Sequence, residues 1–360
     1  MREPRTPIFD KKMGGNHFIM DTIPLQRPQL ILTDPAEVEL AIAHKPDVAG
    51  ALAYSAADFE RFTAACPGLP VGLVLTCPPL DPDREAPWTE DYIARCRQAF
   101  APAMKADAAF WYLRGAVDFR ALRAAVLAVT DLSGRAIVTG LPMAEGDRLI
   151  DNTDCVAAVG VLQRIGVSTV ILSADDKEAL EDALERLAPY ARLSIGVRCP
   201  LAWVDESLTL TNTELLLPMP GERAADLLAA AGRPTLRRLE RDDLEEYILC
   251  PDGRDAHFVD PTTDISDEIE CGARLDERLL ELEDEEAAAF KLLLEEESDL
   301  GTLEECMYMI SRPICLCAES PELLERALRI YCGLALYDGT WEQDEHIVRY
   351  FEEKYGMIRL

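Results

Sequence analysis

The chain has 360 residues, of which 49% are hydrophobic and 28% charged, a composition typical of a globular protein rather than a disordered one. Its 66 acidic and 36 basic residues give a formal net charge of −30. A field of this sign repels phosphate backbones and anionic lipids, and no basic cluster offsets it, so we expect neither nucleic-acid nor membrane binding. The charged first ten residues do not read as a signal peptide, and no apolar stretch reaches the ~18 residues of a membrane span, so we expect a cytoplasmic protein.

From about residue 47 to residue 199, short apolar runs alternate with amphipathic helical stretches, the pattern of βαβ units around a buried parallel sheet. The predicted strands are Pro7–Phe9, Val48–Tyr54, Val71–Cys77, Ala108–Leu113, Ala136–Leu141, Val167–Leu172 and Leu193–Val197. An eighth is less clear, because Asn212 and Glu214 interrupt the apolar stretch Leu208–Leu217. The sequence therefore predicts an α/β fold with a (β/α)8 TIM-type barrel, incomplete if this stretch is no strand. An open doubly wound sheet is the alternative.

Beyond residue 240 the composition changes. Residues 240–305 hold 25 acidic and five basic side chains, which indicates a solvated acidic face or a surface for a partner. A second αβ series then predicts strands at Phe290–Leu294, Ile314–Cys317, Leu334–Tyr337 and Met357–Leu360, and helices at Pro321–Tyr331 and His346–Lys354. We place the domain boundary within 240–255, which gives a barrel over residues 1–245 and a smaller C-terminal αβ segment over 246–360.

Several short motifs occur in an order found in one family. They are Ile8-Phe9-Asp10-Lys11-Lys12-Met13-Gly14-Gly15, Leu32-Thr33-Asp34-Pro35, Gly146-Asp147-Arg148-Leu149, Asn152-Thr153-Asp154 and Val161-Leu162-Gln163-Arg164-Ile165-Gly166-Val167. Together they resemble the homocysteine S-methyltransferases, including the first domain of cobalamin-dependent methionine synthase. The stretch from Arg312 to Ala335 resembles part of the folate-binding module of the same enzyme. The resemblance implies a (β/α)8 barrel and methyl transfer to a thiol in methionine or corrinoid-linked one-carbon metabolism.

The chain departs from this family where the family holds its metal. The resemblance implies a zinc ion on three cysteines, one in an Asn-Cys pair and two in a Cys-Cys pair. Here the first position reads Ser173-Ala174, the chain has no Cys-Cys pair, and the family's Glu-Thr reads Arg114-Gly115. Without soft ligands no zinc lowers the pKa of the homocysteine thiol, which then stays mostly protonated. The arginine also reverses the charge offered to a substrate amine.

Two functional hypotheses follow. The first is a non-catalytic or divergent relative that acts with a corrinoid or other methyl-transfer partner through the acidic segment 240–305. The alternative is an active methyltransferase that moves a methyl group to homocysteine or another thiol through a relocated metal site. We expect no cofactor under the first hypothesis, and zinc only if cysteines elsewhere build such a site.

Barrel active sites lie at the C-terminal ends of the strands. The candidate cleft residues, from this rule and from the resemblance, are Asp10, Arg114, Thr139, Asp147, Thr153, Asp154, Ser173 and Arg198. Arg114 and Arg198 together would bind a carboxylate bidentately. For each candidate the other interpretation is a hydrogen-bonded loop residue.

The eleven cysteines are interpreted mainly as small buried hydrophobes of a reducing compartment. Three groupings would also suit a metal: Cys315 and Cys317 with Cys332, Cys199 with Cys250, and His257 with Asp260 and Asp264. Core packing is the favoured interpretation of the first grouping, and an ordinary polar loop that of the last.

Overall fold

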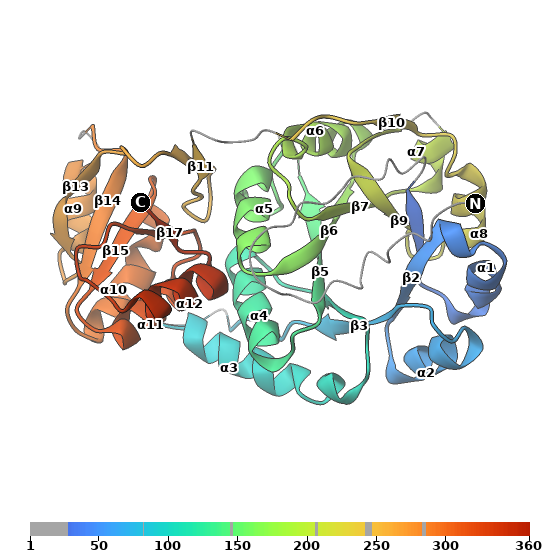
Figure 1. Ribbon diagram of the computed structural model, residues 1–360, viewed down its shortest axis with the longest axis horizontal. Helices are drawn as coiled ribbons and strands as arrows, with labels where there is room; N and C mark the ends of the chain where they lie inside the picture. Colours follow the sequence, from blue (N-terminus) through green and yellow to red (C-terminus); the bar gives the residue numbers. More distant parts are fainter. Residues whose placement is uncertain (1–27, 82, 145–146, 206–207, 242–246, 283–285) are drawn as a thin grey trace.

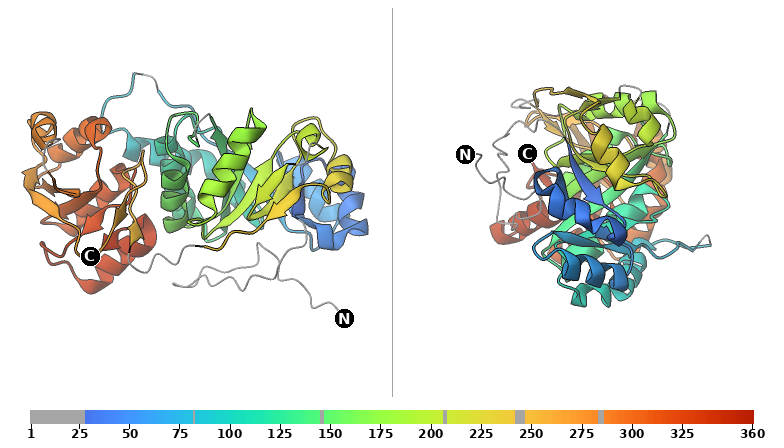
Figure 2. Two further views of the ribbon diagram at one scale, coloured as in Figure 1. Left: turned by 90° about the horizontal axis from the view of Figure 1, so that it is seen from above. Right: turned by 90° about the vertical axis from the view of Figure 1, so that its right-hand side faces the viewer.

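The computed structural model describes residues 28–81, 83–144, 147–205, 208–241, 247–282 and 286–360. These residues form a closed barrel followed by a smaller five-stranded sheet with its own helices (Figure 1). The two parts lie next to each other along the long axis of the molecule (Figure 2). No described helix is both long enough and apolar enough to cross a bilayer.

Eight parallel strands close the barrel, and β1 completes it by pairing with both β2 and β9. The strands are β1 (Gln29–Leu32), β2 (Val48–Ala53), β3 (Val71–Thr76), β4 (Phe110–Arg114), β5 (Ala136–Met143), β6 (Val167–Ala174), β7 (Ser194–Arg198) and β9 (Thr213–Leu217). The helices around them are α1 (Val38–Ala43), α2 (Ala56–Ala65), α3 (Thr89–Phe100), α4 (Phe119–Leu132), α5 (Cys155–Arg164), α6 (Lys177–Leu187), α7 (Leu201–Asp205) and α8 (Ala224–Ala230). The predicted (β/α)8 barrel is confirmed and complete, so the open doubly wound sheet is excluded.

The first barrel strand is not where the sequence placed it. The predicted strand Pro7–Phe9 lies outside the described residues, and β1 is Gln29–Leu32 instead. This strand directly precedes the Thr33-Asp34-Pro35 motif. A run of four residues is too short to show the periodicity of a strand, so the sequence pattern favours the apolar segment Pro7–Phe9 as the first strand instead.

The eighth strand, β9, lies within the stretch 208–217 that the sequence left open. Its two polar residues do not prevent the strand from forming, because both have hydrogen-bond partners. Asn212 adopts a left-handed φ of 47° and exchanges two hydrogen bonds with the backbone of Leu239 (3.0 and 3.1 Å). Glu214 is buried and accepts a hydrogen bond of 2.9 Å from Ser194. Asn212 therefore separates β9 from the short strand β8 (Thr209–Thr211), which pairs with β10 (Thr235–Arg237) outside the barrel.

The C-terminal part is a parallel sheet whose strands follow chain order. Its strands are β13 (Ile265–Glu270), β14 (Ala289–Leu294), β15 (Ile314–Ala318), β16 (Leu336–Tyr337) and β17 (Ile358–Arg359). The connecting helices are α9 (Leu275–Glu281), α10 (Ser298–Cys306), α11 (Pro321–Ile330) and α12 (Glu345–Tyr355). Sequential parallel order with right-handed crossovers puts all four helices on one face, and each helix contacts the next. The C-terminal part therefore has the topology of a partial barrel, with one face free of helices.

A hairpin and a polar interface connect the two parts. The hairpin consists of β11 (Ile248–Leu249) and β12 (Phe258–Val259). At the interface, the fully buried Glu304 of α10 accepts hydrogen bonds from the backbone N–H groups of Trp88 and Thr89 and forms an ion pair with Arg120. Buried Arg123 donates to the carbonyls that end α11, at 2.8 and 2.9 Å. The boundary we drew between residues 245 and 246 lies outside the described residues and stays a prediction.

Candidate functional site

The barrel interior is filled at its centre and polar at the C-terminal strand ends, which we call the barrel mouth. The interior cluster consists of Ile31, Leu52, Phe110, Tyr112, Val138, Ile171, Leu215 and Leu217. Above it, the strand register places Thr76 next to Arg114, and Ser173 next to Arg198. Side chains alternate between the two faces of a strand, so these four polar residues share the inner face with the cluster below them, and we call them the top layer.

Two arginines converge on Tyr54, the residue that follows β2. The guanidinium of Arg114 lies 5.3 Å from the centre of the Tyr54 ring and its Nε donates to Thr76 Oγ1 at 3.2 Å. Arg198 donates from its terminal nitrogen to the Tyr54 hydroxyl at 3.3 Å, and its buried Nε has no hydrogen-bond partner. Within the described part of the chain neither arginine pairs with a carboxylate. Two positive charges thus remain unneutralised at the mouth of a strongly acidic protein.

Tyr112 forms the floor beneath these arginines. Burial raises the pKa of its phenol above the ordinary value, although nearby Arg198 and Arg114 act in the opposite direction. The hydroxyl therefore stays protonated at neutral pH and remains able to donate a hydrogen bond. A Cβ at Gly140 would lie 2.9 Å from this hydroxyl, so glycine at that position leaves room for the tyrosine.

A cavity of about 300 Å³ begins at the barrel mouth and extends between β4 and β5 toward the start of α4. It is lined by Arg114, Ser173 and Arg198 on one side and by Asp118 and Asp151 on the other. The size suits a small metabolite rather than a macromolecule.

The acidic side of the cavity has a structural role. Asp118 caps α4 by accepting from Ala121 N at 2.7 Å, and Asp151 accepts from the backbone N–H groups of Phe119 and Thr153. The rim nearby is apolar, because Val117 and Ile150 are 63% and 70% exposed. A ligand held by the arginines would therefore place apolar atoms against this rim.

The structure brings four of the eight predicted cleft residues to the cavity: Arg114, Thr139, Ser173 and Arg198. Thr139 does not point into the mouth as expected. It is fully buried on the same face of β5 as Ile137 and Leu141, which pack in the cluster with the helices, and its Oγ1 has no hydrogen-bond partner in the described structure.

Three of the other predicted residues do not line the cavity. Asp154 caps α5 through the N–H groups of Val156 and Ala157 at 2.8 and 3.0 Å, and both Asp154 and Asp147 pair with Arg186. Thr153 is buried beside them. These three residues therefore shape the loop before α5. Asp10 lies outside the described residues.

Tyr54, Tyr112 and Thr76 were missed in the sequence. One signal was available: Tyr112 precedes Arg114 by two residues on an expected strand, so both share a face. In the sequence the two tyrosines look like core residues, and only the arginines that lie near them in the structure indicate a polar role.

The metal groupings proposed from the sequence are not assembled as expected. Among the described residues, one group of three potential ligands is close enough to hold an ion: Cys315, Cys317 and Asp338. Cys332, the third ligand expected there, contacts Met307 instead, with 3.4 Å between the sulfurs. His257 pairs with Asp252 at 2.9 Å rather than joining Asp260 and Asp264.

Cys199 and Cys250 also have separate surroundings. Cys250 lies beside the carbonyl of Leu334 in the C-terminal part, at 3.2 Å, whereas Cys199 is buried directly after β7. Burial raises the pKa of the Cys199 thiol to about 12.

No protein-family model matches the sequence, and no curated protein matches it either. Some solved structures are similar to part of the chain. The homocysteine methyltransferase MmuM from Escherichia coli is 13% identical over 58% of this chain and 96% of its own, with a TM-score of 0.43. The carboxyl transferase domain of Rhizobium etli pyruvate carboxylase is 11% identical over 54% of this chain and 40% of its own, with a TM-score of 0.40. Values this low assign neither an activity nor a substrate to the chain.

Proposed function

We propose that this chain is a divergent, homocysteine S-methyltransferase-like barrel that binds a small carboxylate-bearing molecule at its mouth. In this proposal it acts in methionine or corrinoid-linked one-carbon metabolism with a methyl-transfer partner, and its barrel mouth does not activate a thiol through zinc. The observation that carries the proposal is the pair of arginines, Arg114 and Arg198, that no described carboxylate neutralises.

The chemistry of the pair favours an oxyanion. A guanidinium presents a planar fork of donors that matches a carboxylate bidentately, and charge-assisted hydrogen bonds of this kind contribute about 1.5–3 kcal/mol each. Arg198 has an unpartnered Nε, and both guanidinium groups contact Tyr54, Arg114 at the ring and Arg198 at the hydroxyl. A carboxylate between them would also lie within reach of the hydroxyl-bearing residues of the top layer.

The donor set at the mouth does not fit the zinc ion that the resemblance implies. The strand ends there present guanidinium and hydroxyl groups, and residue 173 is a serine. A divalent cation prefers thiolate, imidazole or carboxylate ligands and is repelled by two neighbouring arginines. We therefore derive no thiol-activating step for the barrel, which separates the first hypothesis from its alternative.

The acidic segment 240–305 is proposed as the partner surface with one restriction. Glu304 is buried against the barrel and Glu297 pairs with Arg326 at 3.2 Å, so these two side chains are committed within the chain. Exposed Asp267 and Glu270 on the edge strand β13 remain accessible to a partner, whereas Glu268 of the same strand pairs with Lys291 at 3.4 Å.

Calorimetric titration of the full chain with small mono- and dicarboxylates, and with inorganic phosphate, tests the proposal. We expect carboxylate binding that weakens at least tenfold in Arg198→Gln and in Arg114→Ala, since about 1.4 kcal/mol corresponds to a factor of ten. Arg135→Gln is the matched control, because Arg135 pairs with Asp107 on the surface at 2.6 Å, next to the start of β5. No heat in the wild type, or equal binding in all three variants, would contradict the proposal.

A second assay addresses the alternative hypothesis. The chain is incubated with homocysteine and a methyl-corrinoid, and methionine is quantified. Formation of methionine by the chain alone would favour an active methyltransferase and argue against a role that depends on a partner.

A further inference from the structure

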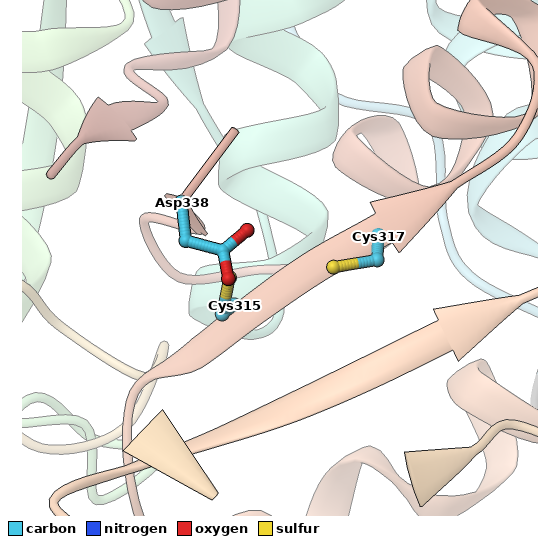
Figure 3. Close-up of side chains that lie close together, drawn as sticks. All are labelled: Cys315, Cys317 and Asp338. Carbon is cyan, nitrogen blue, oxygen red and sulfur yellow. The ribbon is translucent and has the colours of Figure 1, made fainter. Parts of the chain in front are cut away.

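We propose that Cys315, Cys317 and Asp338 bind a zinc ion in the C-terminal part, at a site separate from the barrel mouth. Cys315 and Cys317 lie two residues apart on β15, so their side chains share a face, and Asp338 directly follows β16. The two sulfurs and a carboxylate oxygen all lie within 4.8 Å of one another (Figure 3). In a tetrahedral zinc site with bonds of ~2.3 Å, two sulfurs are roughly 3.8 Å apart, so only small shifts are needed.

The location is typical of a ligand site. Cys315 is in register with Lys291 of β14, which in turn is in register with Glu268 of β13. The side chains of Glu268 and Lys291 are 42% and 12% exposed. Because solvent reaches these two residues, Cys315 and Cys317 lie on the face of the sheet that the helices do not cover. Both cysteines are buried there, and Cys317 lies near the C-terminal end of its strand, where parallel α/β sheets bind ligands.

The carboxylate is already oriented. Lys291 Nζ donates to Asp338 Oδ2 at 2.8 Å, and the backbone N–H and hydroxyl of Thr340 donate to the two Asp338 oxygens at 3.0 and 2.8 Å. Ligating carboxylates are normally held by such outer hydrogen bonds. Gln343, further along the same segment, donates to the carbonyl of Ala318 at 3.3 Å and keeps this segment over the end of β15.

Zinc would offset most of the negative charge of the site. Two thiolates and one carboxylate exceed a divalent cation by one negative charge, and the ammonium of Lys291, 2.8 Å from Asp338, offsets part of it while also pairing with Glu268 at 3.4 Å. Buried charges that are paired in this way avoid the large cost of an isolated charge. Three protein ligands leave the fourth position open to water or to a small ligand.

Without a cation the Cys315 thiol remains protonated. The hydrogen bond with Cys317, together with burial, raises the pKa of the Cys315 thiol above its ordinary value. Zinc uptake must therefore release protons, and affinity is expected to increase with pH.

Cobalt(II) titration of the chelator-treated full chain tests the site, because thiolate ligation to Co²⁺ gives an intense near-ultraviolet charge-transfer band. We expect one equivalent of Co²⁺ to bind, Zn²⁺ to displace it, and the band to fall by at least half in Cys315→Ser and Cys317→Ser. Cys271→Ser is the matched control: Cys271 is equally buried, follows β13, and contacts the carbonyl of Asp299.

A further variant guards against misfolding of the cysteine mutants. Asp338→Asn keeps both thiols and the shape of the side chain, and we expect at least tenfold weaker Zn²⁺ binding by competition with a chromophoric chelator. Absence of the charge-transfer band in the wild type, or its loss in Cys271→Ser but not in Cys317→Ser, would overturn the proposal. These outcomes are independent of carboxylate binding at the barrel mouth.

Discussion

The contact of Glu304 with the barrel gives a quantitative prediction about how the two parts depend on each other. This carboxylate comes from α10 and caps the first turn of α3, where it accepts from Trp88 N, from Thr89 N at 3.1 Å and from the Thr89 hydroxyl. Arg120 pairs with it and also lies 4.3 Å from the centre of the Trp88 ring. Glu304→Ala removes every one of these acceptor contacts at once.

The magnitude follows from the contacts. Loss of a helix cap costs about 1 kcal/mol, and a buried donor left unsatisfied costs about 1–3 kcal/mol. Removal of one partner of a buried ion pair costs about 3–5 kcal/mol, which is an upper bound here because the Arg120 side chain is 21% exposed. These losses overlap, so we expect Glu304→Ala to lower the free energy of unfolding by about 3–4 kcal/mol. Glu304→Gln keeps an acceptor oxygen and should lose about half as much.

Urea denaturation followed by tryptophan fluorescence and by far-ultraviolet circular dichroism measures this loss. The control is Glu305→Ala, the next residue along the chain, which is exposed and should change stability by less than about 0.5 kcal/mol. If the two variants unfold at the same urea concentration, the buried carboxylate does not stabilise the interface. An earlier, separate transition in Glu304→Ala would show that its loss uncouples the C-terminal part from the barrel.

Three further outcomes can be measured on the same protein. Gly140→Ala should reduce carboxylate affinity and cost about 1–3 kcal/mol of stability, because the new Cβ crowds the Tyr112 hydroxyl; unchanged calorimetric binding would contradict this. Although burial acts to raise the pKa of Asp131, hydrogen bonds from Lys354 and a neighbouring arginine lower it overall, so its stabilising effect is present above the unfolded pKa of about 3.9 and is lost as pH falls through the folded value. A series of melting temperatures from pH 7 to pH 3 should therefore show a smaller acid-induced loss for Asp131→Asn than for wild type. Arg198→Lys keeps the charge but loses the fork, so it should weaken carboxylate binding more than it changes stability, as titration and thermal melts would show.

The sequence predicted the fold well where strands are buried on both faces. Runs such as Val71–Thr76 and Ile314–Ala318 are continuous and apolar, and each was expected within a few residues. The strand Ile265–Glu270 was missed because it lies at the sheet edge with Asp267, Glu268 and Glu270 exposed, so its composition resembles a solvated loop.

The sequence predicted the two arginines of the candidate site because a charged residue is unusual at the end of an apolar strand. Arg114 and Arg198 end apolar strands, and a charge there has few structural explanations. Asp154 was included for its motif, yet an aspartate that caps a helix looks the same in a sequence as one that binds a ligand. Tyr112 was overlooked for the opposite reason, because a tyrosine in an apolar strand is normally core.

The negative net charge of the protein and the positive charge at the barrel mouth affect an anionic ligand at different distances. The net charge of −30 repels an anionic ligand in bulk solvent, but salt screens that repulsion beyond about 8 Å at physiological ionic strength. Inside the cavity the proposed carboxylate would meet Arg114 and Arg198 at hydrogen-bond range, where salt screens the attraction less than it screens the long-range repulsion. The acidic exterior would therefore slow encounter with anions in general, while the arginine pair would retain those small enough to enter. Selectivity for a carboxylate at this site would then depend on the shape of the cavity and on bidentate hydrogen bonding, because the long-range field of the protein repels every anion.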